Sequence, residues 1–211
     1  MYTDEPGAGE VRAAFPDARA ERVESGWENR WKEFHRPASA GGLWIGPPWI
    51  PPPDGEVAVV VDPGRAFGTG AHATTRACIE LLAGVAHGSV LDAGCGSGVV
   101  AVAAARLGFA PVVAVDSDPV AVAVAGETAR ANGVYLDVRR LDVLSDELPE
   151  TDAVVANIEL GVVERLLPLV QARIAITSGY LASDSPRVPG WSVVDRLELD
   201  GWAADVLARG H

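Results

Sequence analysis

The chain has 211 residues, of which 48% are apolar, with a formal net charge of -12 and two cysteines. This length suits one domain of about 150 to 200 residues with a short extension. The acidic balance argues against direct nucleic-acid binding, because phosphate contacts need Lys and Arg, whereas a basic protein would be attracted. No apolar run reaches the roughly 18 to 20 residues of a membrane span, and the N-terminus MYTDEPGAGE is acidic. We therefore expect a cytoplasmic protein with no membrane partner.

The first part of the chain, 1–55, is predicted to form an N-terminal tail, a short helix and a Pro-rich linker arm. Its opening residues are acidic and weakly patterned, which is typical of a mobile tail or a frayed helix. Trp27, Trp31 and Phe34 then fall at helical spacing, which the docking of a short helix on the domain would explain. The prolines of LWIGPPWIPPPDG enforce an extended path after it.

Residues 56–211 alternate short apolar runs with helical patterns, which is typical of βαβ units around a parallel sheet. The dipeptide Asp200-Gly201 is a type I′ hairpin signal, so we expect the last two strands to be antiparallel. The predicted strands are 57–61, 89–93, 112–116, 135–141, 152–157, 179–183, 191–199 and 202–208. The predicted helices are 73–85, 98–107, 119–131 and 161–173.

The strongest local motif is VLDAGCGSGVVAVAAARLG, in which a predicted strand is followed by three glycines and an Ala-rich helix. Glycines at such a turn allow a ligand to approach the backbone and the helix to pack closely on the strand. We expect Gly94 and Gly96 to contact a cofactor. The spacing G-x-G-x-G differs from the G-x-G-x-x-G that seats a pyrophosphate, which argues against a hydride-transferring dehydrogenase.

Carboxylates at the ends of successive strands sharpen this interpretation. Asp92 precedes the glycines, where it would face an ammonium better than a phosphate, and Asp116 could accept hydrogen bonds from two ribose hydroxyls. Helix capping is the alternative for Asp116, but Asp118 already fills that role. Together these features predict an S-adenosylmethionine site, with S-adenosylhomocysteine as product, at the switch point of a doubly wound sheet. Asp142 is a candidate contact for the adenine amine and equally a solvated turn residue.

The stretch VVVDPGRAFGTGAHATT, from Val59 to Thr75, has too many glycines for a helix interior and too many polar atoms for a buried strand. It is either an ordinary turn or a loop whose backbone approaches a ligand.

Four blocks resemble the bacterial family that methylates the eleventh protein of the large ribosomal subunit. They are DPGRAFGTGAHATTRACIELL, VLDAGCGSGVVAVAAARLG, VVAVDSDPVAVAVAGETARANGV and DAVVANIELGVVERLLP. The resemblance covers the chain from about Trp27 to Arg209. It implies the α/β, Rossmann-like fold of class I S-adenosylmethionine-dependent methyltransferases, with a mostly parallel seven-stranded sheet and an antiparallel C-terminal hairpin. It also implies a basic, ribosomal protein as the methyl acceptor.

The same resemblance implies roles for individual residues. The loop would cover the cofactor, with Phe67 and His72 at the methyl-transfer chamber. The cofactor contacts would be Thr75, Phe67, Gly94, Asp116 and Asn157.

Methyl transfer from a sulfonium needs a neutral amine held in line with the sulfur-methyl bond and shielded from water. Asn157, at the end of a predicted strand, could offer its side-chain oxygen to the amine N–H. His72 could accept the amine proton, since an unperturbed histidine has a pKa of about 6.5. The alternatives are a strand-ending turn residue for Asn157 and a surface loop residue for His72.

Two departures from the family pattern concern the acceptor side. The family has a separate α+β domain before the linker, and fewer than thirty residues precede Trp27 here, so we expect a truncated substrate domain. Glu159, in NIELG, stands where the family usually has a small apolar residue or leucine, and SPRVPG after Asp184 is too short for a crossover helix.

The leading hypothesis is therefore an S-adenosylmethionine-dependent N-methyltransferase that acts on a lysine or N-terminal amine of a protein. The alternatives are a methyltransferase for small-molecule amines and a non-catalytic S-adenosylmethionine-binding module.

Overall fold

The computed structural model describes residues 13–15, 35–63 and 70–210. The predicted helix around Trp27 lies outside these ranges, as does nearly all of the predicted tail. Residues His35–His211 form one compact unit built from two sheets and four helices of the described chain. The expected boundary at residue 56 stays a prediction.

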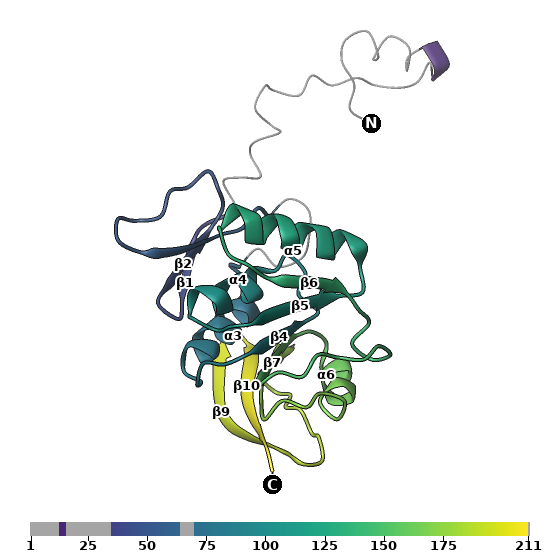
Figure 1. Ribbon diagram of the computed structural model, residues 1–211. Helices are drawn as coiled ribbons and strands as arrows, with labels where there is room; N and C mark the ends of the chain where they lie inside the picture. Colours follow the sequence, from purple (N-terminus) through teal and green to yellow (C-terminus); the bar gives the residue numbers. More distant parts are fainter. Residues whose placement is uncertain (1–12, 16–34, 64–69, 211) are drawn as a thin grey trace. The chain divides into compact units, whose positions relative to one another are not determined.

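The larger sheet has seven strands in the order β6-β5-β4-β7-β8-β10-β9 (Figure 1). Neighbours from β6 to β8 are parallel, and β10 is antiparallel to both β8 and β9, which confirms the predicted fold class. The chain runs outward from β4 to β6 and then returns to the other side of β4, so the switch point lies between β4 and β7. The strands are β4 (Val90–Ala93), β5 (Val112–Asp116), β6 (Asp137–Arg140), β7 (Ala153–Asn157), β8 (Ile174–Leu181), β9 (Trp191–Leu199) and β10 (Trp202–Arg209).

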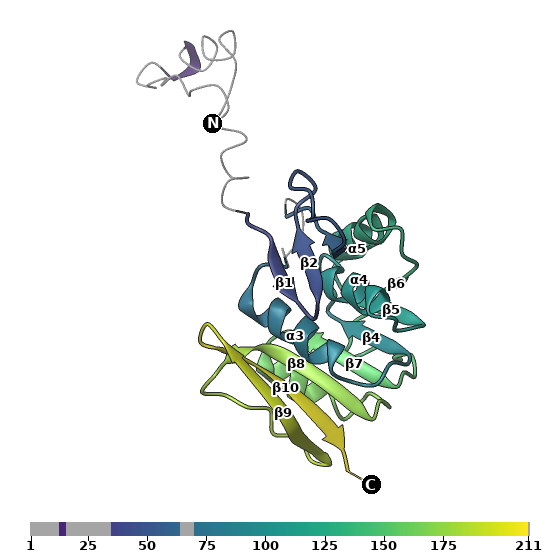
Figure 2. The same cartoon turned by 90° about the vertical axis from the view of Figure 1, so that its left-hand side faces the viewer.

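Helices cover both faces of this sheet, three on one side and one on the other (Figures 1 and 2). The first three are α3 (Ala73–Ala83), α4 (Val99–Arg106) and α5 (Pro119–Ala131), and the fourth is α6 (Leu160–Leu166). None of the described helices is long and apolar enough to cross a membrane.

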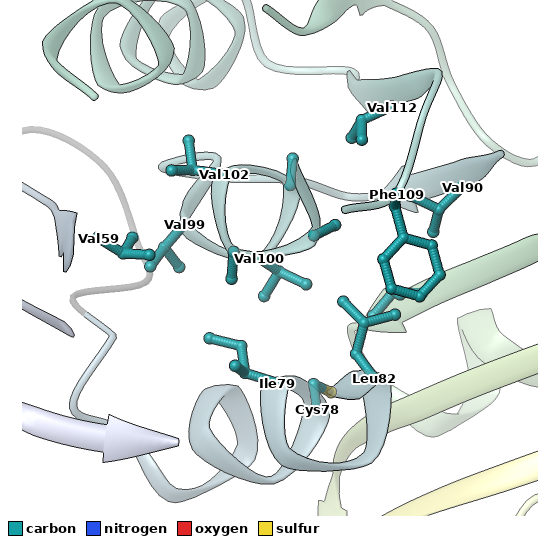
Figure 3. Packing of buried hydrophobic residues seen from close by; sticks show 14 of the residues in the cluster. Val59, Cys78, Ile79, Leu82, Val90, Val99, Val100, Val102, Phe109 and Val112 are labelled. Atoms are coloured by element: carbon teal, nitrogen blue, oxygen red, sulfur yellow. The ribbon is translucent and has the colours of Figure 1, made fainter. Parts of the chain in front are cut away.

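The core divides into two clusters because strand side chains alternate between the faces. In β4, Val90 packs with α3 and α4, whereas Leu91 and Ala93 pack with α6. Figure 3 shows the first cluster, in which side chains of α3 such as Leu82 face those of α4 such as Val100. The continuous apolar runs of the sequence thus follow from strands that are buried on both faces.

A second, three-stranded sheet precedes the larger one. It consists of β1 (Ala38–Ala40), β2 (Leu43–Gly46) and β3 (Val57–Val60), with β2 antiparallel to β1 and parallel to β3. The strand predicted at 57–61 is confirmed as β3. The expectation that it belongs to the same parallel sheet as the later strands is wrong, because it pairs with β2 in the smaller sheet. Val59 of β3 is buried in the same apolar cluster as Leu43 and Ile45 of β2 and residues of α3 and α4. The Asn132 side chain accepts the backbone N–H of Val60 and donates to the Val60 carbonyl.

Two predicted boundaries near the C-terminus are also wrong. The helix predicted to continue to residue 173 ends at Leu166, because Pro168 has no N–H to extend it. The strand predicted to begin at residue 179 begins at Ile174, and Gly179 lies inside it. Other turn signals are confirmed: Asp118 caps α5, and the hairpin residues Asp200 and Gly201 both have positive φ.

Asp92, in β4, is a buried carboxylate with only 3% of its surface exposed. Its Oδ2 accepts the backbone N–H of Ala101 at 3.0 Å, in the first turn of α4, where the helix dipole favours a negative charge. Desolvation nevertheless raises its pKa to about 7; the Ala101 hydrogen bond opposes the rise and the charge of Asp116 adds to it. The sheet thus holds a carboxyl group that is half protonated near neutral pH.

Asp92→Asn is expected to raise the free energy of unfolding above pH 7 and to leave it nearly unchanged at pH 4. The folded protein keeps the Asp92 proton up to about pH 7, whereas the same carboxyl group in the unfolded chain has its ordinary pKa of 3.8 and loses the proton earlier. Stability contributed by this group therefore falls as pH rises through that window, by about 1.4 kcal/mol per pH unit. Urea denaturation from pH 4 to 8 measures the difference. Asp54→Asn, at an exposed position, controls for the lost charge, and a pH-independent gain in Asp92→Asn would contradict a neutral Asp92.

Candidate methyl-transfer site at the carboxyl edge of the sheet

The predicted site residues gather where β4, β5 and β7 end. Because these strands are parallel neighbours, their last residues and the turns that follow share one edge of the sheet. The glycine turn follows β4, Asp116 ends β5, and Asn157 ends β7. This edge includes the switch point, where ligands of doubly wound sheets bind.

The glycine turn is built from backbone conformations that disfavour other residues. Gly94 and Gly98 both have φ of +77°. A Cβ atom on Gly98 would lie 2.9 Å from the Cβ of Ala125 in α5, and one on Gly94 would lie 2.6 Å from Cγ2 of Ile158. The turn therefore brings α5 and the residue that follows β7 close to its backbone.

Most N–H groups of this turn have acceptors within the protein. Those of Gly94 and Cys95 donate to the carbonyl of Val115 at 2.9 Å, and that of Gly96 donates to Asp116. A pyrophosphate seat needs N–H groups that point at the ligand. The turn is instead bound to the end of β5, which agrees with the spacing argument against a dinucleotide.

Asp116 is held by this turn and by its own loop. Its Oδ2 accepts from Gly96 N and its Oδ1 accepts from Asp118 N, each at 3.0 Å. Each carboxylate oxygen can accept two hydrogen bonds, so the group retains capacity for two further donors. Its half-buried position and fixed orientation fit the predicted contact with a pair of ribose hydroxyls.

Asn157 and Thr75 meet although 82 residues separate them. Asn157 Nδ2 donates to Thr75 Oγ1 at 3.3 Å, from the end of β7 to the first turn of α3. Thr75 is buried and Asn157 is half-buried. Because its nitrogen is directed to Thr75, the amide oxygen of Asn157 is the acceptor that can serve a ligand.

His72 is the N-cap of α3, and its side chain is exposed. Nδ1 lies 2.8 Å from Thr74 Oγ1, which leaves Nε2 as the nitrogen able to exchange a proton with a ligand. The ring packs edge-on against Trp202 of β10, with centroids 5.1 Å apart. Trp202 was not predicted from the sequence; the one signal for it is that an aromatic residue directly follows the hairpin dipeptide Asp200-Gly201.

The remaining predicted residues lie around this centre. Asp142 is exposed and caps its own turn, with Oδ1 accepting from Leu144 N at 2.9 Å, so its contact with adenine stays a prediction. Glu159 is exposed at the start of α6 and makes no capping hydrogen bond. Phe67 lies outside the described residues.

A buried ionic network beside the site was not predicted. Asp205, fully buried in β10, accepts from the Tyr180 hydroxyl at 2.9 Å and from Arg196 Nη1 at 3.1 Å. Arg196 Nη2 also donates to the carbonyls of Ala182 and Asp184, which holds the segment after β8. The only signal in the sequence was an acidic residue within the apolar run WAADVLAR.

Comparisons with known proteins agree with this architecture. The family model described as Ribosomal protein L11 methyltransferase (PrmA) matches residues 10–207. A protein with that name from Symbiobacterium thermophilum is 41% identical over 97% of this chain. Another from Heliobacterium modesticaldum is 40% identical over 88% of this chain. The chain spans 70% and 65% of their lengths, respectively.

A solved structure extends the agreement to three dimensions. The ribosomal protein L11 methylase from Lactobacillus delbrueckii subsp. bulgaricus aligns with a TM-score of 0.68 and 27% identity, covering 81% of this chain and 96% of the other. On the strength of the family match, the relatives and this alignment, the chain belongs to the ribosomal protein L11 methyltransferase family, whose members depend on S-adenosylmethionine.

Proposed function

We propose that this chain transfers a methyl group from S-adenosylmethionine to a lysine or N-terminal amine of a ribosomal protein of the L11 type. The observation that carries the proposal is the contact of Asn157 with Thr75 at the switch point, beside the fixed carboxylate of Asp116. Family membership supports the reaction class. The net charge of -12 supports a basic acceptor.

The described residues fit the cofactor by the chemistry of their polar groups. When bound, S-adenosylmethionine supplies a methyl group on a sulfonium. Asp116 would hold the ribose, the backbone at Gly94 and Gly96 would flank the cofactor, and Asp142 would accept from the adenine amine. Asp92 would attract the ammonium of the amino-acid portion, and a cation close to it would lower the pKa of its carboxyl group.

For the acceptor, the chain's task is to orient an amine and to keep water away from it. The amide oxygen of Asn157 would accept one amine N–H, so that the nitrogen lone pair points along the sulfur-methyl axis. His72 Nε2 would accept the proton that the amine loses, at an exposed position from which it can pass to solvent. Lysine and N-terminal amines both fit this scheme.

Asp116→Ala should weaken the binding of S-adenosylhomocysteine at least about tenfold in titration calorimetry. Losing charge-assisted hydrogen bonds to the ribose costs about 1.5 to 3 kcal/mol each. Asp118→Ala is the matched control, because it removes the N-cap of α5 from the same loop without touching the ribose acceptor. Unchanged affinity in Asp116→Ala, or an equal loss in Asp118→Ala, would contradict the ribose assignment.

Asn157→Ala should slow single-turnover methylation of ribosomal protein L11 by about a hundredfold or more at saturating cofactor, because one positioned contact in the transition state is lost. His72→Ala should have a smaller effect, since water can also accept the proton. Thermal unfolding checks that both variants fold. If both keep the parental rate, the methyl-transfer chamber lies elsewhere; if the parent methylates no amine while binding the cofactor, the non-catalytic module is the better description.

A further inference from the structure

Gly179 lies inside β8 at a point where the strand touches the end of β7. Its φ is +102°, a conformation that side chains of L-residues rarely adopt. A Cβ atom at this position would overlap the carbonyl oxygen of Ile158 and lie 2.7 Å from its carbonyl carbon and 3.0 Å from its nitrogen. Only glycine therefore allows the two backbones to approach this closely.

The side chain of Ile158 meets a second glycine on its other side. Its Cγ2 atom would lie 2.6 Å from a Cβ on Gly94, in the turn after β4. Ile158 is thus enclosed by the glycine turn after β4 and by β8, and it directly follows Asn157. A shift of Ile158 in either direction would move the Asn157 backbone with it.

We propose that Gly179 and Gly94 clamp Ile158 and thereby set the position of the Asn157 amide, which makes Gly179 and Ile158 positioning residues for methyl transfer. The inference rests on the proposed function. It assigns a role to the β8 segment, which lies outside the cofactor-binding residues. The clamp couples the two strands beside β7, because Gly94 belongs to the glycine turn after β4 and Gly179 belongs to β8.

The strand β8 is fixed more firmly than Ile158, so a new side chain at position 179 would displace Ile158. On one side of Gly179, Ser178 Oγ donates to the Ala203 carbonyl at 2.6 Å. On the other, the Tyr180 hydroxyl contacts the Thr177 carbonyl at 3.0 Å and Asp205 at 2.9 Å. The pairing of β8 with β10 also shifts register between Ala203 and Ala204, as expected for a bulge at Gly179.

By contrast, Ile158 lies in a short connection between β7 and α6. Its backbone N–H donates to the Ser178 carbonyl at 3.1 Å, and the next residue, Glu159, begins the helix without a capping hydrogen bond. The displacement therefore passes to Asn157 and its 3.3 Å contact with Thr75. A misplacement of about 1 Å can cost about a hundredfold in rate.

The test compares Gly179→Ala with Gly190→Ala. Gly190 also has a positive φ, +79°, but a Cβ there would meet nothing within 4 Å, so this variant controls for backbone strain alone. We expect Gly179→Ala to lower kcat for methylation by about tenfold or more, with a smaller change in the Kd for S-adenosylhomocysteine. Gly190→Ala should stay within about twofold of the parent in both. Equal kcat values in the two variants would overturn the proposal.

A double-variant cycle separates positioning from general damage. If Gly179 acts through Asn157, adding Gly179→Ala to Asn157→Ala should cause little further loss of kcat. Additive losses would show that Gly179 acts by another route. Should Gly179→Ala fail to fold, Ile158→Ala serves instead, because it removes the side chain that Gly94 faces and should likewise lower kcat more than cofactor affinity.

A readout without catalysis keeps the clamp distinguishable from the proposed function. The side-chain amide of Asn157 should shift in the ¹⁵N–¹H NMR spectrum of Gly179→Ala and not in that of Gly190→Ala. The amide of Asn132, bonded to Val60 and Thr128, should stay in place in both. An unmoved Asn157 signal refutes the clamp even if the enzyme is active, and a moved signal supports it even if no acceptor is methylated.

Discussion

The hydrogen bonds from the glycine turn to the end of β5 are the constraint on which the site depends. Gly94 and Cys95 donate to Val115, and Gly96 donates to the Asp116 carboxylate, so the turn after β4 wraps around its neighbouring strand. This wrapping fixes Asp116, directs the chain into α4 and brings Gly94 against Ile158 at the end of β7. Three strand ends are thus joined by the protein's own contacts, which is the pre-organisation that a methyl-transfer site needs.

The same packing places a carboxyl group where its charge is costly. Asp92 is buried among apolar strand residues, and the helix N-terminus that donates to it only partly offsets the loss of water. A cationic ligand at the strand edge would stabilise the ionised form. If the cofactor ammonium lies near Asp92, as proposed, cofactor binding would be linked to the protonation of Asp92, and loss of the proton from Asp92 would strengthen the attraction for the ammonium group.

Beyond β7, the same edge of the sheet is organised by β8 and β10 and less by helices. A buried Asp205 joins Tyr180 to Arg196, and Arg196 holds the carbonyls that follow β8. Trp202 from the hairpin lies against His72 at the start of α3. Residues from the C-terminal third of the chain thus lie along the sheet edge at which α3 begins. Segments that are far apart in the chain therefore meet at this edge.

Much of the fold could be predicted from the sequence, because its determinants are local. Apolar runs marked most strands, Asp118 marked the start of α5, and Asp200-Gly201 marked the hairpin. Two predictions failed for different reasons: one depended on strand pairing, and the other overlooked a local signal. The strand at 57–61 joined a separate sheet, and Pro168 ended a helix that the periodicity would have continued.

The kinds of residue at this edge of the sheet follow from the sequence alone: glycines after β4, a carboxylate at the end of β5 and an amide at the end of β7. The sequence could not determine their mutual contacts, which depend on strand order. Asn157 reaches Thr75 across 82 residues only because β7 lies next to β4 and α3 begins at the same edge. The role proposed for Gly179 was equally hidden, since nothing near it in the chain shows that the backbone of Ile158 lies against it. Such close approaches arise from pairing between distant strands, and that pairing is decided by the packing of the whole sheet.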